Sequence, residues 1–127
     1  MLKAAGALIL CGAFLLGGSA PTMAAPHPKV RLKVVYGVKG GSAKSAWLHC
    51  APVGGTHPNA QAACRMLRRV KGEPSKLNAN PNAACTQEIQ PHAAVVAGQW
   101  YGRKVHWAKF FANGCQMRAV GGSVLAI

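Results

Sequence analysis

The sequence predicts an α+β domain in which an antiparallel sheet carries a helix and disulfides tie the irregular stretches. Three observations lead to this fold class. Apolar and basic residues alternate over residues 30–36, with the two-residue period of a half-buried strand. Apolar residues recur at helical spacing over residues 60–70. Beyond residue 24 the chain holds an even number of cysteines: Cys50, Cys64, Cys85 and Cys115.

Residues 1–24 are predicted to be a secretory signal peptide and not part of the fold. Lys3 is followed by an apolar run over residues 4–16, and residues 22–24 (Thr-Met-Ala) have the small-residue character of a cleavage site before Ala25. We therefore expect a secreted, extracellular protein.

No membrane anchor is expected in that leader. Cys11 follows Leu10, whereas a lipid-modified cysteine requires a small residue before it. The remaining residues 25–127 are too few for more than one domain.

The first half of the domain is expected to hold two strands and a helix. Val30 to Tyr36 forms the first strand, Gly37 to Ser45 a turn, and Ala46 to Cys50 the second strand. A helix should begin near Pro58, which suits a first helical turn, and end near Gly72.

The second half begins with an irregular connection over residues 73–84, which are rich in Pro and Asn. Strands are expected over Ala93 to Ala97 and Gln99 to Phe110, separated at Gly98, and a last strand over Ser123 to Ile127. A short helical turn is expected within Asn113 to Val120.

The four cysteines are predicted to form two disulfides, because even numbers of cysteines in exported chains are usually oxidised. The sequence alone allows three pairings. Zinc is the alternative, but the chain has no Cys-x-x-Cys pair and no matching pair of histidines, so no metal site is expected.

The charge balance excludes most enzyme chemistry. The chain has 15 Lys and Arg against two acidic residues, Glu73 and Glu88, and it has no Asp. A Ser-His-Asp triad therefore lacks its acid, and a two-carboxylate site would require both glutamates. The glycine-rich stretch over residues 37–42 lacks the spacing of a phosphate-binding loop. We expect neither enzymatic activity nor a cofactor.

Several conspicuous side chains have structural interpretations. His57 is read as a residue at the helix entry and not as a ligand. Trp47, Trp100 and Trp107 are read as core or dimer-face residues. His92 is a candidate contact with a bound partner.

Short motifs follow one another in a fixed order along the domain. They are Cys50-Ala51-Pro52, Gly55-Thr56-His57-Pro58, Cys64, Cys85 with Pro91 six residues on, Trp100-Tyr101-Gly102-Arg103-Lys104-Val105, Phe111-Ala112-Asn113-Gly114-Cys115-Gln116-Met117 and Ser123-Val124-Leu125-Ala126-Ile127. Together they resemble the Streptomyces subtilisin inhibitor family. The resemblance implies a five-stranded antiparallel sheet with two helices on one side, the pairings Cys50–Cys64 and Cys85–Cys115, a homodimer, and inhibition of serine proteases.

The resemblance also implies a protease-binding loop. In protease nomenclature Cys85 is then P3, Thr86 is P2, Gln87 is P1 and Glu88 is P1′, so the reactive bond is Gln87–Glu88. The flanking residues of the loop are Ala84, Cys85, Thr86, Ile89, Gln90 and Pro91. Such a loop binds as a substrate does but gains affinity because it is already ordered. The disulfide and Pro91 keep the ends of a cut bond in place, so religation competes with hydrolysis.

This loop departs from the family pattern, which commonly has proline at P2 and an apolar or basic P1. The string Cys-Thr-x-Glu is similar to the reactive loop of Kazal inhibitors, an unrelated fold. We therefore predict a hydrogen bond between the Thr86 hydroxyl and the Glu88 carboxylate that braces the loop.

Gln87 narrows the class of target by elimination. A trypsin-like pocket needs a cation, because an amide would leave the buried acid of the pocket unpaired. Chymotrypsin-like pockets prefer large rings. Subtilisin-like clefts are shallower, so a subtilisin-like serine protease is the expected partner.

Two alternatives remain open. Basic stripes could make the chain a secreted cationic protein that binds nucleic acid, acidic glycans or anionic membranes, although a solvated surface is the favoured interpretation and nucleic acid is not expected as the primary partner. The chain could also be a transglutaminase substrate through Gln87. The stripes are Arg65, Arg68, Arg69 and Lys71 in one stretch and Arg103, Lys104 and Lys109 in the other.

Overall fold

The structure is a computed structural model that describes residues 27–127, so the predicted signal peptide lies outside the described residues. It contains a five-stranded sheet with the strand order β3-β2-β1-β4-β5, in which every neighbouring pair is antiparallel. The strands are β1 (Val30–Val38), β2 (Ala43–Cys50), β3 (Gly54–Gly55), β4 (His92–Trp100) and β5 (Arg103–Phe111).

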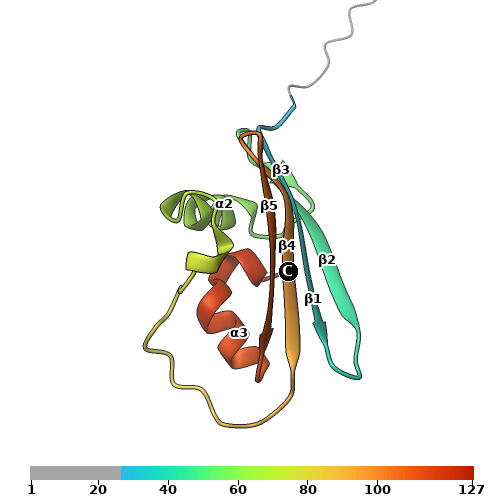
Figure 1. Ribbon diagram of the computed structural model, residues 1–127, viewed down its shortest axis with the longest axis vertical. Coiled ribbons are helices and arrows are strands. Elements are labelled where there is room, and N and C mark those ends of the chain that lie inside the picture. The colour runs from blue at the N-terminus through green and yellow to red at the C-terminus, as the bar shows by residue number, and fades with distance from the viewer. Residues whose placement is uncertain (1–26) are drawn as a thin grey trace, which may run out of the picture.

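Two α-helices cover one side of this sheet, as Figure 1 shows. They are α2 (Ala60–Arg69) and α3 (Gly114–Gly121), and two short 3-10 helices accompany them, η1 (Pro74–Lys76) and η2 (Gly122–Leu125). The predicted fold class is therefore confirmed. Within residues 27–127 no helix is long and apolar enough to cross a bilayer.

The core lies between the sheet and the helices. Val30, Leu32 and Val34 of β1 are buried, whereas Arg31 and Lys33 between them are exposed. Alternate residues of a strand point to opposite faces, so the sequence pattern itself selects which face of β1 meets the helices. From the helical side the buried residues are Ala63, Cys64, Leu67, Met117, Val124 and Leu125.

The other face of the sheet, which we call the outer face, carries no helix. The strand register places its side chains in four rows that cross β2, β1, β4 and β5. The two basic rows are His49-Arg31-Gln99-Lys104 and Trp47-Lys33-Ala97-His106, and the two apolar rows are Ser45-Val35-Val95-Ala108 and Ala43-Gly37-Ala93-Phe110.

Three predicted strand limits are wrong: the end of the first strand, the start of the second, and the break at Gly98. The turn expected over Gly37 to Ser45 occupies only residues 39–42, because β1 continues to Val38 and β2 begins at Ala43. Strand β4 runs through Gly98 without a break, and the reversal comes at Tyr101–Gly102. Gly98 has a φ of 151°, and a Cβ there would collide with the carbonyl oxygen of Arg31. The glycine therefore permits close approach of β1 and does not mark a turn.

The prediction of a last strand over Ser123 to Ile127 is also wrong. This segment forms η2, and its backbone bonds to side chains instead of to a neighbouring strand. The ring of His57 meets the Val124 carbonyl oxygen through Nε2 at 2.9 Å, and Asn59 Nδ2 donates to the Ala126 carbonyl oxygen at 3.0 Å. His57 is thus structural, as expected. The fifth strand is instead β3, the two-residue strand Gly54–Gly55, where no strand was predicted.

The helices and disulfides follow the predictions more closely. Helix α2 begins at Ala60 and ends at Arg69, slightly inside the expected limits, and α3 fills the stretch expected to hold a helical turn. The pairings implied by the family resemblance are confirmed: Cys50–Cys64 joins β2 to α2, and Cys85–Cys115 joins the predicted loop to α3.

Candidate functional site

Residues 83–91 form a segment without helix, strand or turn that leads into β4. Figure 1 places it at the end of the molecule where β4 begins, beside α3. The side chains of residues 86–90 are all exposed, and that of Ile89 is 75% exposed. The structure thus presents the predicted protease-binding loop as an accessible stretch without regular secondary structure.

Asn113, the residue before α3, binds the backbone in the middle of this loop. Its Nδ2 donates hydrogen bonds to the carbonyl oxygens of Thr86 at 3.2 Å and of Glu88 at 2.9 Å. Its Oδ1 accepts a hydrogen bond from the backbone N–H of Gln116 at 2.9 Å, which caps the helix. Asn113 is only 1% exposed, so the Asn113 end of these bonds is shielded from water, whereas Thr86 and Glu88 are exposed.

The two bonds from Asn113 flank Gln87 on either side. Within residues 27–127 the carbonyl oxygen of Gln87 accepts no hydrogen bond, and its side chain is exposed. The arrangement therefore fixes the peptide groups around the Gln87–Glu88 bond and leaves the carbonyl of that bond available to a partner.

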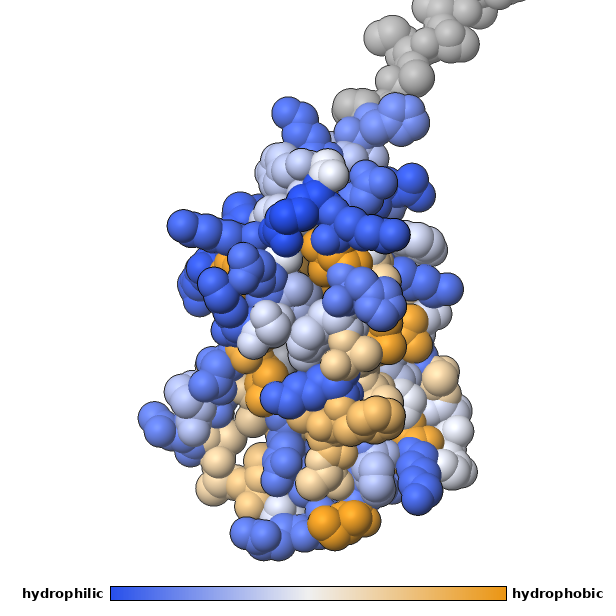
Figure 2. Space-filling view, viewed as in Figure 1, coloured by the Kyte–Doolittle hydropathy of each residue, from blue (hydrophilic) through white to orange (hydrophobic). Residues whose placement is uncertain are grey.

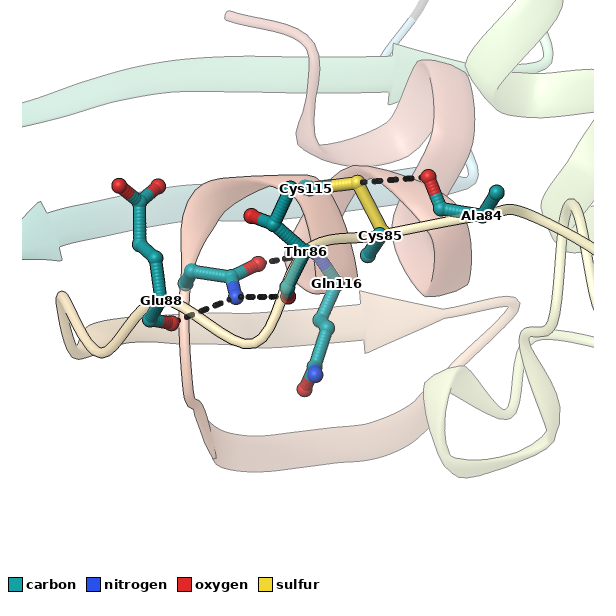
Figure 3. Close-up of a disulfide and its surroundings, with 7 residues drawn as sticks. Ala84, Cys85, Thr86, Glu88, Cys115 and Gln116 are labelled. Atoms are coloured by element: carbon teal, nitrogen blue, oxygen red, sulfur yellow. Dashed lines mark hydrogen bonds between the residues drawn. A yellow bond between two sulfur atoms is a disulfide. The ribbon is translucent and has the colours of Figure 1, made fainter.

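Further contacts hold both ends of the loop. Upstream, the Cys85–Cys115 disulfide fastens the chain to α3, with the two Cα atoms 5.7 Å apart (Figure 3). Downstream, the backbone N–H of Gln90 donates to the Ala112 carbonyl oxygen at 2.7 Å, and that of Lys39 donates to the Pro91 carbonyl oxygen at 2.9 Å. A cut between these anchors would leave both new ends attached to the scaffold.

His92 supports the loop from within the fold. Its ring is 8% exposed, and its Nδ1 lies 2.8 Å from the Gln90 carbonyl oxygen. Since a carbonyl can only accept, Nδ1 carries the proton and donates. The ring thus fixes the downstream end of the loop, and its contact with a partner stays a prediction.

The predicted bond between the Thr86 hydroxyl and the Glu88 carboxylate is absent from the structure. Figure 3 shows the Glu88 carboxylate extending away from Thr86. Asn113 holds the backbone carbonyls of the same two residues instead. This role of Asn113 was not predicted, although Asn113 stands two residues before Cys115 and an Asn directly before a short helix is a recognisable capping signal.

The fold and the site together define a small disulfide-bonded domain that presents one exposed, anchored loop. The chain belongs to the subtilisin inhibitor-like family, which matches residues 26–113. This confirms the family resemblance, and because the family is one of inhibitors, it also confirms the expectation of a non-enzymatic protein. No three His, Cys, Asp or Glu side chains of residues 27–127 are grouped as metal ligands.

Individual proteins show the same likeness. The subtilisin inhibitor of Streptomyces violaceus is 39% identical over 132 residues, which cover 93% of this chain and 90% of that protein. The subtilase-type protease inhibitor of Streptomyces coelicolor is 43% identical over 82 residues, or 64% of this chain and 57% of that protein. Among solved structures, Streptomyces caespitosus sermetstatin, crystallised in complex with Bacillus licheniformis subtilisin, is 27% identical with a TM-score of 0.60, covering 76% of this chain and 97% of that chain.

Proposed function

We propose that this protein inhibits subtilisin-type serine proteases by presenting residues 84–91 as a substrate-like loop, with Gln87–Glu88 as the reactive bond. The observation that carries the proposal is the pair of hydrogen bonds from Asn113 to the carbonyl oxygens of Thr86 and Glu88. The names of the relatives and the subtilisin complex of the structural neighbour support the class of target.

In the proposed complex the extended loop pairs with the protease as a substrate strand does. The side chain of Gln87 enters the specificity pocket, and its unpaired carbonyl oxygen enters the oxyanion hole. Affinity arises because the loop loses little conformational entropy on binding, since Asn113 and the disulfide have already ordered it.

Slow hydrolysis follows from the same anchors. After attack on Gln87, the new amino terminus at Glu88 stays in place through the Asn113 bond and the Gln90–Ala112 bond. The acyl side stays in place through the Cys85 disulfide. The amine therefore remains close to the acyl-enzyme, and religation outcompetes the entry of water.

The test is a titration of subtilisin, a trypsin and a chymotrypsin with the protein, followed by amino-terminal sequencing of any slow cleavage product. We expect stoichiometric inhibition of subtilisin and a new amino terminus at Glu88. A new terminus elsewhere would move the reactive bond, and absence of subtilisin inhibition would overturn the proposal.

We also propose that the protein is exported, by cleavage before Ala25, and that it forms a homodimer. The apolar rows of the outer face support a dimer: Phe110 is 82% exposed, and a hollow of about 320 Å³ opens between it, Pro91 and Val38. The two copies would pack through their apolar rows, about a two-fold axis that crosses the strands there. The basic rows of the two copies would then lie apart. Light scattering over a range of concentrations tests the dimer, and sequencing of the exported protein tests the cleavage site.

A further inference from the structure

The basic rows of the outer face bring together cations that are distant in sequence. Arg31 and Lys33 come from β1 and Lys104 from β5, and the register aligns Arg31 with Lys104 across Gln99 of β4. All three cationic side chains are exposed. Figure 2 shows hydrophilic side chains gathered over the end of the molecule where the β4–β5 turn lies.

No acidic residue neutralises these cations. Glu73 pairs with Lys76 at 3.1 Å, and this is the one salt bridge within residues 27–127. The other acid, Glu88, lies in the loop that precedes β4. Neighbouring strands are about 4.8 Å apart, so Arg31 and Lys104 stand roughly 10 Å from each other. Cations this close repel one another, and a bound anion would relieve the repulsion.

Arg31 is oriented by an aromatic neighbour. Its guanidinium carbon lies 5.6 Å from the ring centroid of Trp47, the only aromatic residue of the basic rows besides its two histidines. A guanidinium stacked on a ring keeps its N–H groups free, so two of them can donate bidentate hydrogen bonds to the oxygens of a phosphate group. Trp47 stays 40% exposed, but it is the one indole or phenyl ring of the basic rows, whereas proteins that bind single strands stack successive bases on several aromatic rings; a polymer without bases is therefore favoured.

We propose that the basic rows bind an extended anionic polymer whose charges are phosphate groups and which carries no bases, such as inorganic polyphosphate or poly(glycerol phosphate). The rows lie away from the loop: they cross β4 at Ala97 and Gln99, five and seven positions after His92, or about 17 and 24 Å along a strand. A bound polymer therefore leaves the loop free, and the protein would inhibit its protease while held on an anionic polymer.

The test compares two triple variants with equal loss of charge. R31Q/K33Q/K104Q removes the cations of the basic rows, and the control R65Q/R68Q/R69Q removes exposed cations of α2 on the other side of the sheet. Binding of polyphosphate and of poly(glycerol phosphate) is measured by calorimetry at several salt concentrations. Circular dichroism on heating checks that each variant folds, and subtilisin inhibition is measured separately.

We expect the outer-face variant to bind the polymer at least about tenfold more weakly than the natural protein. The slope of log affinity against log salt concentration should fall by roughly two. The control should bind within about twofold of the natural protein. Binding of either polymer with this pattern supports the proposal, and the two polymers show whether phosphodiesters suffice. Equal losses in both variants, or no binding of either polymer at physiological salt, would overturn it. Tighter binding of a single-stranded oligonucleotide of matched charge would overturn the choice of a polymer without bases.

Discussion

The side-chain amide nitrogen of Asn113 lies 2.9 Å from the carbonyl oxygen of Glu88, the residue that follows the proposed reactive bond. The same nitrogen reaches the Thr86 carbonyl oxygen, while the amide oxygen caps α3. One buried side chain thus joins the loop to the helix. Its two roles can be separated by mutation, because the amide nitrogen binds the loop and the amide oxygen caps the helix.

Asn113→Asp should keep the helix cap and lose both bonds to the loop, because a carboxylate cannot donate. We expect the inhibition constant for subtilisin to rise at least about tenfold and the loop to be cleaved faster, since each hydrogen bond lost from this buried side chain costs about 1 kcal/mol. Asn113→Ala, the comparison, should in addition lower the free energy of unfolding by about 1 kcal/mol through loss of the cap. Inhibition by the Asp variant equal to that of the natural protein would contradict the role of the amide.

Gln87→Lys should create trypsin inhibition, because the ammonium would pair with the acid of a trypsin-like pocket. The measurement is a titration of trypsin with the variant. Gln90→Lys is the matched control, an exposed glutamine of the same loop that lies outside the reactive bond, and it should leave trypsin active. If Gln87→Lys does not inhibit trypsin, the specificity residue lies elsewhere.

Glu88→Gln should change little, because the structure holds the backbone of Glu88 and not its carboxylate. We expect subtilisin affinity within about threefold of the natural protein and unfolding within about 0.5 kcal/mol, as for other exposed substitutions. A tenfold loss of affinity would show that the Thr86–Glu88 bond predicted from the sequence forms in the complex after all.

The two disulfides should have different effects when removed. In the chain-entropy model the loss of Cys85–Cys115, with a sequence separation of 30, costs about 4 kcal/mol, and the loss of Cys50–Cys64, with a separation of 14, about 3 kcal/mol. Only the first anchors the loop, so C85S/C115S should be hydrolysed quickly by subtilisin, whereas C50S/C64S should resist below its unfolding temperature. Equal rates of hydrolysis in the folded variants would remove the disulfide from the mechanism.

Gly98→Ala should destabilise the sheet by at least about 2 kcal/mol in urea unfolding, because the added Cβ would meet the Arg31 carbonyl oxygen and the φ of 151° is strained for alanine. Gly102 is the control: its φ of 84° is also unfavourable for alanine, but no atom lies within 4 Å of the added Cβ. Gly102→Ala should therefore cost only about 1 kcal/mol. Equal costs would show that close approach of β1 is unimportant.

The sequence predicted features that depend on local periodicity. The alternation from Val30 to Val34 and the helical spacing of Ala63, Cys64 and Leu67 both reappear as buried faces. Predictions failed where a distant residue decides the local structure. Gly98 resembles a strand break until Arg31 is placed against it, and residues 123–127 resemble a strand until His57 and Asn59 bind their carbonyls.

The candidate site shows the same division. Motif spacing located Cys85 and the loop, but the brace came from Asn113, which is 25 residues from Glu88 and becomes its neighbour only after folding. The basic rows were hidden for a similar reason. The predicted basic stripes contain Lys104 but neither Arg31 nor Lys33, because the rows join residues of β1 and β5 through the strand register.

Because Asn113 is bonded both to the loop and to the first turn of α3, the loop and this helix should open as one cooperative unit. The working lifetime of the protein in the presence of excess protease would then be governed by the opening free energy of α3, which amide hydrogen exchange in that helix reports. Substitutions that stabilise α3, at positions far from any surface that a protease contacts, would lengthen the time before the loop is cleaved.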